Sequence, residues 1–263
     1  MPRWLLKYFC IWWMGATTVF FFPYSIFLVL IGGGDHSMKF IQGLWSRLML
    51  WAPGATLNVR GKENVDPSRP TVFISNHQST LDIPALLLAL SPVPFRFVIK
   101  KIIQYVPLFG WYLTLAGFIF IDRSSKKSTQ ETLELASQRI RGGTSILVFA
   151  EGTRSADGQI LQFKKAMFAI PARAGVLITP VAVEGSRVIM PKNSWSVQPG
   201  EIRVNIGTPI DPTPFGDDRE ALAAHVRQKV IELAKEIGGP GGADLAAQPR
   251  SEPKPASQEE AEA

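Results

Sequence analysis

The sequence of 263 residues contains a single cysteine, Cys10, so it has no intramolecular disulfide and no metal site built on paired cysteines. Cys10 lies in an apolar stretch without the polar neighbours that activate a thiol, which makes it a poor nucleophile. The GxSxG pattern of a serine nucleophile elbow is also absent. The sequence therefore offers no evident side-chain nucleophile.

Acidic residues are scarcer than basic ones, with a net charge of +6 and a pI of about 9.5. Residues 238–263 hold two basic and five acidic side chains, so this tail carries −3 and the rest of the chain +9. A basic body favours an anionic partner such as a lipid headgroup, a phosphorylated substrate, an acidic carrier or nucleic acid. No basic run is interleaved with aromatics, and several tryptophans lie in the first fifty residues. This pattern favours a membrane, and we expect no nucleic-acid partner.

Residues 4–31 form a long apolar run whose only charge is Lys7. As one helix it would reach roughly 42 Å, more than the ~30 Å hydrocarbon core of a bilayer. A signal peptide is an alternative, but the run is too long and no cleavage site follows it. Because Pro23 can kink a helix, a bent or re-entrant insertion is an alternative to a clean span.

Residues 37–54 predict a second helix with a wide apolar face, fit to lie in the membrane interface or to pair with the first helix. The alternative is a core helix of the following domain. We therefore predict a membrane-embedded helical hairpin over residues 1–54. At the other end, residues 238–263 are poor in large apolar side chains and rich in Gly, Pro and Glu, which predicts disorder.

Between these segments, over residues 55–237, short β-rich runs alternate with helical patterns. One helix is predicted at 128–140, opened by a capping box of Ser128 and Glu131, and another at 218–237. The alternation predicts an α/β domain with a mixed, largely helix-covered sheet of about seven strands. The strand candidates are residues 56–60, 71–75, 95–100, 117–122, 145–150, 177–183 and 202–207.

The stretch "SNHQSTLD", residues 75–82, places a histidine near a carboxylate. Pro84 cannot lie deep in a helix, so a helix must begin close to residues 79–82, with His77 in the preceding turn. Across that turn His77 and Asp82 can meet, and a carboxylate bonded to one ring nitrogen leaves the other free to accept a proton. The alternative is a helix-capping Asp82 beside an ordinary loop histidine.

The other two histidines are weaker candidates for a base. His36 lies in a Gly-rich link beside the apolar helices, and His225 lies on an amphipathic helix. If a histidine base exists, it is His77. Without a protein nucleophile, such a base would activate a substrate hydroxyl or water directly.

A second constellation is "SILVFAEGTRS", residues 145–155, in which a strand runs into Glu151, Gly152 and Arg154. Ligands of open α/β sheets bind beyond the carboxyl ends of strands, and arginine suits bidentate binding of phosphate. A surface Glu–Arg ion pair at a turn is the alternative.

Further cations follow other strands or turns and together suit an anionic substrate, although each alone could be a solvated edge. They are Lys100, Arg123 and Lys164. Pro180 and Val181 lie in an apolar strand interrupted by proline, which by itself indicates a buried or edge strand.

These residues resemble a known family. "NHQSTLD" resembles the NHxxxxD motif of the glycerolipid acyltransferases. "GFIFIDR", "FAEGTRS" and "ITPVAVEG" are similar to the family's second, third and fourth blocks, and the four occur in the family's order over residues 75–185. The chain most resembles the bacterial 1-acylglycerol-3-phosphate acyltransferases, which make phosphatidic acid.

The resemblance implies that His77 is the general base on the 2-hydroxyl of a lysolipid and that Asp82 orients it. The hydroxyl would attack the thioester of acyl-CoA or acyl-carrier protein without an acyl-enzyme. No metal or cofactor is expected, and no P-loop for ATP is present. The implied phosphate-binding residues are Arg123, Glu151, Gly152, Thr153 and Arg154, with Lys100 and Lys164 as additional cations, and the implied acyl-binding region holds Pro180 and Val181.

The resemblance also implies three partners, namely the lipid bilayer, a lysolipid acceptor and the acyl donor. It implies a bacterial inner membrane as the location. The positive-inside rule predicts that the active site lies on the cytoplasmic face, from the basic residues Arg3, Lys7, Lys39 and Arg47. The alternatives are another acceptor such as lyso-ornithine lipid or a lysophospholipid, a membrane-attached thioesterase, or a non-catalytic lipid-binding protein.

Overall fold

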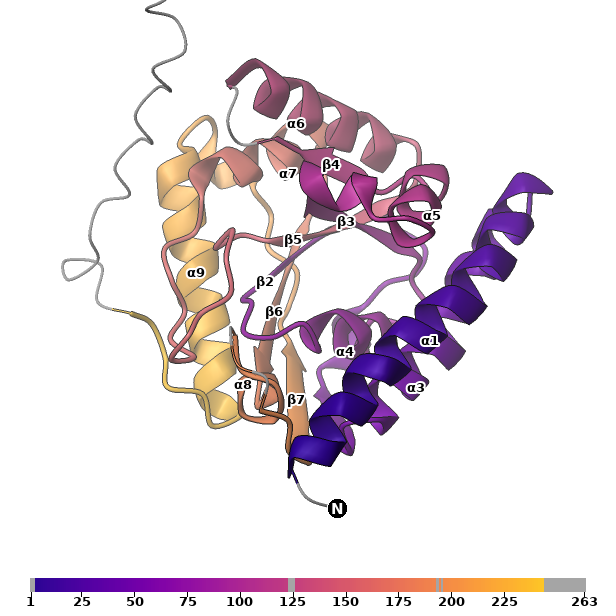
Figure 1. Cartoon of the computed structure of the whole chain (residues 1–263). Helices are drawn as coiled ribbons and strands as arrows, with labels where there is room; N and C mark the ends of the chain where they lie inside the picture. Colours follow the sequence, from indigo (N-terminus) through magenta and orange to yellow (C-terminus); the bar gives the residue numbers. More distant parts are fainter. Residues whose placement is uncertain (1–2, 123–125, 193, 195, 244–263) are drawn as a thin grey trace, which may run out of the picture.

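A computed structural model describes residues 3–122, 126–192, 194 and 196–243 of the chain (Figure 1). Arg123 lies outside the described residues, as does the part of the tail beyond residue 243. The disorder predicted for that part of the tail therefore stays a prediction.

Seven strands form one mixed sheet in the order β1-β7-β6-β2-β5-β3-β4. Strands β6 and β7 are antiparallel, and every other neighbouring pair is parallel. Each strand falls on one of the predicted β-rich runs, so the predicted mixed α/β sheet of seven strands is confirmed. The strands are β1 (Ala55–Arg60), β2 (Val72–Ser75), β3 (Phe95–Lys100), β4 (Ile119–Ile121), β5 (Ser145–Phe149), β6 (Ile178–Glu184) and β7 (Gly200–Ile206).

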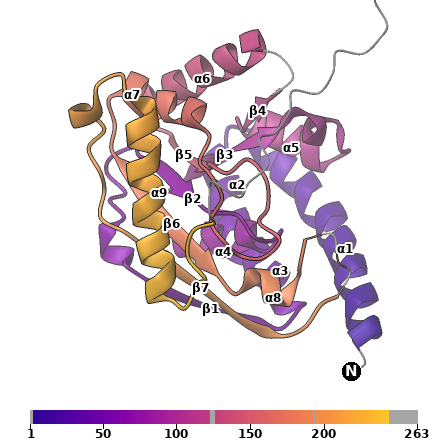
Figure 2. The ribbon, with the colours of Figure 1, turned by 90° about the vertical axis from the view of Figure 1, so that its left-hand side faces the viewer.

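Helices cover both faces of the sheet (Figures 1 and 2). Side chains alternate along β2, so Phe73 joins a core cluster on one face, while Val72 and Ile74 join a second cluster on the other. The first face carries α4 (Asp82–Ala89), α5 (Phe109–Leu115) and the N-terminal helices. The second carries α6 (Lys126–Arg141), α7 (Ala169–Ala174) and α9 (Arg219–Glu236).

Helix boundaries follow the predictions with one exception. α9 begins after Asp218, whose carboxylate caps the helix by accepting the N–H groups of Glu220 and Ala221. The predicted capping box at Ser128 is wrong, because α6 begins at Lys126 and Ser128 already lies inside it. The carbonyl of Ser128 accepts the hydroxyl of Thr132 one turn later, as an interior helical residue does.

The N-terminal segment forms two antiparallel helical arms. α1 (Arg3–Leu30) runs through Pro23 as one helix, and the return arm consists of α2 (Gly34–Phe40), a π-helical turn, η1 (Ile41–Trp45), and α3 (Ser46–Trp51). The indole Nε1 of Trp13 donates to the carbonyl of Leu48 at 3.0 Å, which confirms the predicted pairing. Much of the return arm is also buried in the domain core, as the core-helix alternative supposed. Its buried apolar residues in that core are Met38, Ile41, Trp45, Met49 and Leu50.

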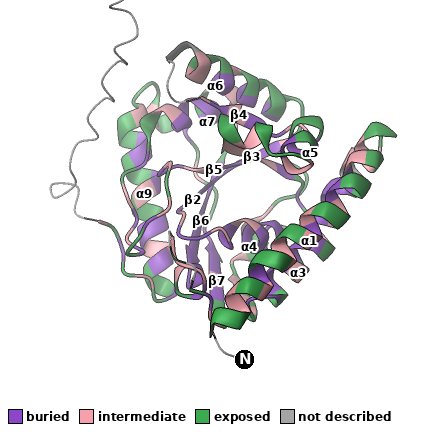
Figure 3. Cartoon of the chain, viewed as in Figure 1, coloured by how far each residue is buried: buried purple, intermediate pink, exposed green. Residues whose placement is uncertain are grey.

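The outer side of α1 is apolar and exposed (Figure 3). The stretch Trp4–Leu30 is long and apolar enough to cross a membrane, by length and composition. The segment from η3 (Lys101–Tyr105) to α5 exposes further large apolar side chains, and α5 contacts α1 where the ring of Phe109 meets that of Phe22 at 5.2 Å. We call these exposed residues of both segments the apolar surface; they include Trp4, Tyr8, Trp12, Phe20, Tyr24, Phe27, Ile102, Tyr105, Val106, Trp111 and Leu115.

Residues 238–243, assigned by the sequence to the disordered tail, pack against the domain in the structure. The N–H of Ala243 donates to the carbonyl of Ile160, and the N–H of Ile160 donates to the carbonyl of Gly241. Arg227 on α9 fixes this contact by donating to the carbonyls of both Ala243 and Ile160. The ordered domain therefore extends at least to residue 243.

Candidate active site

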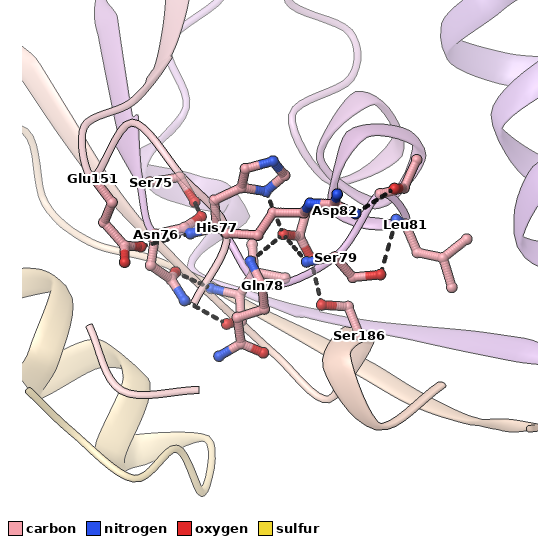
Figure 4. Close-up of polar contacts among 12 residues, drawn as sticks. Ser75, Asn76, His77, Gln78, Ser79, Leu81, Asp82, Glu151 and Ser186 are labelled. Atoms are coloured by element: carbon pink, nitrogen blue, oxygen red, sulfur yellow. Dashed lines mark hydrogen bonds and ion pairs between the residues drawn. The ribbon is translucent and has the colours of Figure 1, made fainter. Parts of the chain in front are cut away.

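The candidate site lies at the carboxyl ends of three adjacent parallel strands, where the sequence predicted it. His77 follows β2, Glu151 follows β5, and Ser186 follows β6 (Figure 4). Because parallel strands end at the same edge of a sheet, these three turns meet.

The loop of residues 76–81 folds around one carboxylate. α4 begins at Asp82 with Pro84 in its first turn, as predicted. The Oδ2 atom of Asp82 accepts the N–H groups of Gln78 at 2.6 Å and Ser79 at 2.9 Å, and it lies 2.7 Å from Nδ1 of His77. The prediction that His77 and Asp82 meet across the turn is thus confirmed.

The imidazole of His77 is fixed on two sides. Its ring stacks on Phe149 of β5, with centroids 3.9 Å apart and planes 12° apart. Because a carboxylate only accepts, Nδ1 carries the proton toward Asp82, which leaves the Nε2 lone pair to accept one. Asp82 is fully buried, whereas 16% of the His77 side chain is exposed, and Nε2 has no hydrogen-bond partner among the described residues.

Glu151 is directed at the backbone of the same loop. Its Oε1 accepts the N–H of His77 at 2.7 Å and its Oε2 accepts the N–H of Leu161 at 3.0 Å. Only 2% of the residue is exposed, and this burial raises its pKa to about 7 against the opposing effect of the two amides. In the structure Glu151 thus braces the His77 loop through both of its oxygens, and the phosphate-binding role that the resemblance implied for it stays a prediction.

Residues 151–154, which we call the EGTR loop, carry the cation Arg154 beside the start of α4. The Nη1 of Arg154 donates to the hydroxyl of Thr80 at 3.0 Å. The Nζ of Lys192 donates to the hydroxyl of Thr153 at 3.2 Å and to the carbonyl of Arg154 at 2.8 Å. Sequence reasoning missed Lys192, because it follows no strand or motif and only the folded chain brings it to this loop.

Gly152 makes a tight turn after β5. Its φ is +75°, in the left-handed region that favours glycine, and its N–H donates to the carbonyl of Phe149. The loop after β5 is joined to the His77 loop by a hydrogen bond from the N–H of Ser155 to the carbonyl of His77 at 2.7 Å.

Other predicted site residues are not joined to this arrangement. Lys100 and Lys164 are exposed, and in the described part of the chain neither side chain bonds to the His77 loop. Pro180 and Val181 are buried in the middle of β6, where Val181 packs in the core with Phe73. The acyl-binding role of these two residues stays a prediction.

One cavity lies away from His77. Its volume is about 680 Å³, and Thr71, Leu177 and Thr179 line it together with residues of the neighbouring loops. These residues lie at the amino ends of β2 and β6, so the cavity opens at the edge opposite His77. Its lining includes no residue of the His77 loop.

Comparison with known proteins agrees with this geometry. A family model described as Acyltransferase matches residues 56–184. The chloroplastic 1-acyl-sn-glycerol-3-phosphate acyltransferase of Arabidopsis thaliana is 35% identical over 196 residues, which cover 73% of this chain and 53% of that protein. The protein of the same name from Pseudomonas aeruginosa is 34% identical over 206 residues, which cover 74% of this chain and 79% of that one.

Among solved structures, the 1-acyl-sn-glycerophosphate acyltransferase PlsC of Thermotoga maritima matches with a TM-score of 0.79 at 27% identity. The match covers 89% of this chain and 95% of that one. The chain spans about half the length of the two plant relatives that it matches, from Arabidopsis thaliana and Brassica napus. The residues matched by the family model include His77, Asp82 and Arg154, on which the resemblance rested. The chain therefore belongs to the acyltransferase family that includes these 1-acyl-sn-glycerol-3-phosphate acyltransferases.

Proposed function

We propose that this chain transfers a fatty acyl group from acyl-CoA or acyl-carrier protein to the free 2-hydroxyl of 1-acylglycerol-3-phosphate, giving phosphatidic acid. The observation that carries the proposal is the His77–Asp82 pair, joined at 2.7 Å, with Nε2 open at the carboxyl ends of the strands. The names of the matched relatives support the choice of acceptor.

In this mechanism Nε2 of His77 accepts the proton of the 2-hydroxyl while its oxygen attacks the thioester carbonyl carbon. Asp82 stabilises the imidazolium through Nδ1. The tetrahedral intermediate then collapses, the C–S bond breaks, and the imidazolium returns its proton to the leaving thiolate. Because the thioester is already an activated acyl donor, we propose that neither ATP nor another cofactor takes part.

The acceptor phosphate would lie beside Arg154 and Lys192. One N–H of the Arg154 guanidinium goes to Thr80, and its other N–H groups have no hydrogen-bond partner among the described residues. Two of the N–H groups of the Lys192 ammonium go to the EGTR loop, which leaves one for a ligand. Direct contacts from Gly152, Thr153, Arg123, Lys100 or Lys164 remain predictions.

The apolar surface supports attachment to a membrane. One stripe of α1, which includes Cys10, Thr17, Phe22 and Ser25, is buried against the domain, and the opposite side is exposed. A helix held along its length cannot be surrounded by lipid, so we propose that α1 lies in one leaflet with η3 and α5 beside it. The basic residues near these helices favour the cytoplasmic face of a bacterial inner membrane.

The proposal is tested with purified protein in detergent or vesicles, by pairing each of several lysolipids with acyl-CoA and with acyl-carrier protein. We expect phosphatidic acid from 1-acylglycerol-3-phosphate, and His77→Ala should form it at least about 10³-fold more slowly. Lyso-ornithine lipid and lysophospholipids serve as competing acceptors. Thioester hydrolysis that proceeds equally without any acceptor would instead show a thioesterase.

A further inference from the structure

The end of β6 and the turn that follows it contact the segment carrying the His77–Asp82 pair at three successive points. The side chain of Asn76 forms two hydrogen bonds with the backbone of Val183, at 2.9 and 2.8 Å. The Nε2 of Gln78 donates to Oε2 of Glu184 at 2.8 Å. Finally, the hydroxyl of Ser186 donates to Oδ1 of Asp82. A segment far away in sequence thus runs along the loop that carries the His77–Asp82 pair.

The two oxygens of Asp82 are bound very differently. Oδ2 accepts Nδ1–H of His77 and the N–H groups of Gln78 and Ser79, all from its own loop. Oδ1 accepts the hydroxyl of Ser186, its single hydrogen-bond partner among the described residues. Because Asp82 is fully buried, no water replaces a donor that is lost, and hydrogen bonds to a buried charge are the strong ones.

The backbone places Ser186 in a position that it cannot easily leave. Gly185 has a φ of +89°, and a Cβ at this position would lie 2.1 Å from the carbonyl oxygen of Glu201 on β7. Its N–H is held by Oε1 of Glu184 at 3.1 Å. Ser186 then begins the short helix α8 (Ser186–Ile189) and is fully buried. The turn therefore presents the hydroxyl to Asp82 from a rigid edge of the sheet.

We propose that Ser186 is a positioning residue for acyl transfer. The donors on Oδ2 hold one end of the carboxylate, and Ser186 fixes its rotation about the Cβ–Cγ bond, so that Oδ2 faces Nδ1 of His77. Ser186 touches no substrate, and it acts on His77 only through Asp82. The inference rests on the proposed function, because it assumes that His77 is the base.

The test compares three variants in steady-state acyl transfer. Ser186→Ala removes the hydroxyl and should lower kcat roughly 10- to 100-fold, as expected for loss of one hydrogen bond to a buried charge, with both KM values within about twofold of wild type. Ser186→Thr keeps a hydroxyl and should recover most of the loss. Ser137→Ala is the matched control: this serine is equally buried, and it donates to Leu133 on α6. It should lower the melting temperature but not kcat.

A Ser186→Ala enzyme with kcat within twofold of wild type would overturn the proposal. So would a folded Ser186→Thr enzyme as slow as Ser186→Ala, or an equal loss of kcat in Ser137→Ala, which would show a general effect of stability. If Ser186→Ala does not fold, the Ser186→Thr and Ser137→Ala enzymes decide. Failure of the proposed function looks different, because the wild-type enzyme would then form no phosphatidic acid or His77→Ala would keep normal activity.

Discussion

Replacing Glu151 by Gln separates two roles for the EGTR glutamate. Ionised or protonated, the carboxyl group presents an oxygen to each of the amides of His77 and Leu161. A glutamine presents one oxygen and one NH2 group, so the backbone N–H of either His77 or Leu161 would face the NH2 group and lose its acceptor. Leaving one buried donor unsatisfied costs about 1–3 kcal/mol.

If this loss displaces the His77 loop and so raises the free energy of the transition state by the same amount, kcat falls roughly 5- to 150-fold. The KM for the lysolipid should stay within about threefold, because backbone N–H groups already occupy both oxygens of the side chain. Kinetics at saturating donor measure both constants. The control is Glu201→Gln, since Glu201 is exposed and its carboxylate accepts only from Asn58 in the part of the chain that the structure describes. A normal kcat with a large rise in the acceptor KM would refute the bracing role and restore phosphate binding.

The same structure yields four further expectations. His77→Ala should lower acyl transfer by about 10³-fold or more, as in other deletions of a catalytic base, and near-normal turnover would contradict the mechanism. Arg154→Ala should raise the KM for the phosphorylated acceptor about tenfold with a smaller change in kcat; an unchanged KM would move the phosphate site elsewhere. The raised pKa of Glu151 means that the folded state keeps a proton that the unfolded chain releases above its ordinary value of 4.5. The stabilising contribution of Glu151 is therefore present below pH 4.5 and is lost as the pH rises through about 7, by up to ~1.4 kcal/mol per pH unit. Denaturant unfolding of the wild type should show this slope, and that of Glu151→Gln should not. Trp111→Glu, at a residue 56% exposed on α5, should weaken binding to anionic vesicles without lowering the melting temperature; full binding would exclude α5 from the membrane contact.

The strands and the His77–Asp82 pair were predictable because each depends on local signals. Buried strands require apolar runs, and Pro84 fixes the start of α4 to within a few residues, which leaves His77 in a turn where it can reach Asp82. Parallel strands then bring the EGTR turn to the same edge without further information.

The direction of Glu151 was not predictable from the sequence. A glutamate at the end of a strand looks the same when it faces solvent, a ligand or a backbone amide. Only the folded chain shows that the carboxylate oxygens of Glu151 accept the N–H groups of His77 and Leu161. Ser186 was missed for a similar reason, because its partner Asp82 is distant in sequence and a Gly–Ser pair has no motif of its own.

The return arm was ambiguous because a wide apolar face suits both a bilayer and a protein core. Residues such as Ile41 and Trp45 are apolar in either case, and the sequence does not say which surface they contact. The structure resolves the ambiguity by packing them with α4, so the arm pairs with α1 on one side and with the domain on the other.

Because the return arm packs against both α1 and the domain, the segment that we propose to contact the membrane is also needed for the domain to fold. Cutting away residues 1–54 would remove Met38, Ile41 and Trp45 from beneath the helix that carries Asp82, and the cavity left behind would cost several kcal/mol. Proteolysis in this region would not release a working water-soluble enzyme. A soluble version would have to be made by replacing the outward side chains of α1 and leaving the return arm intact.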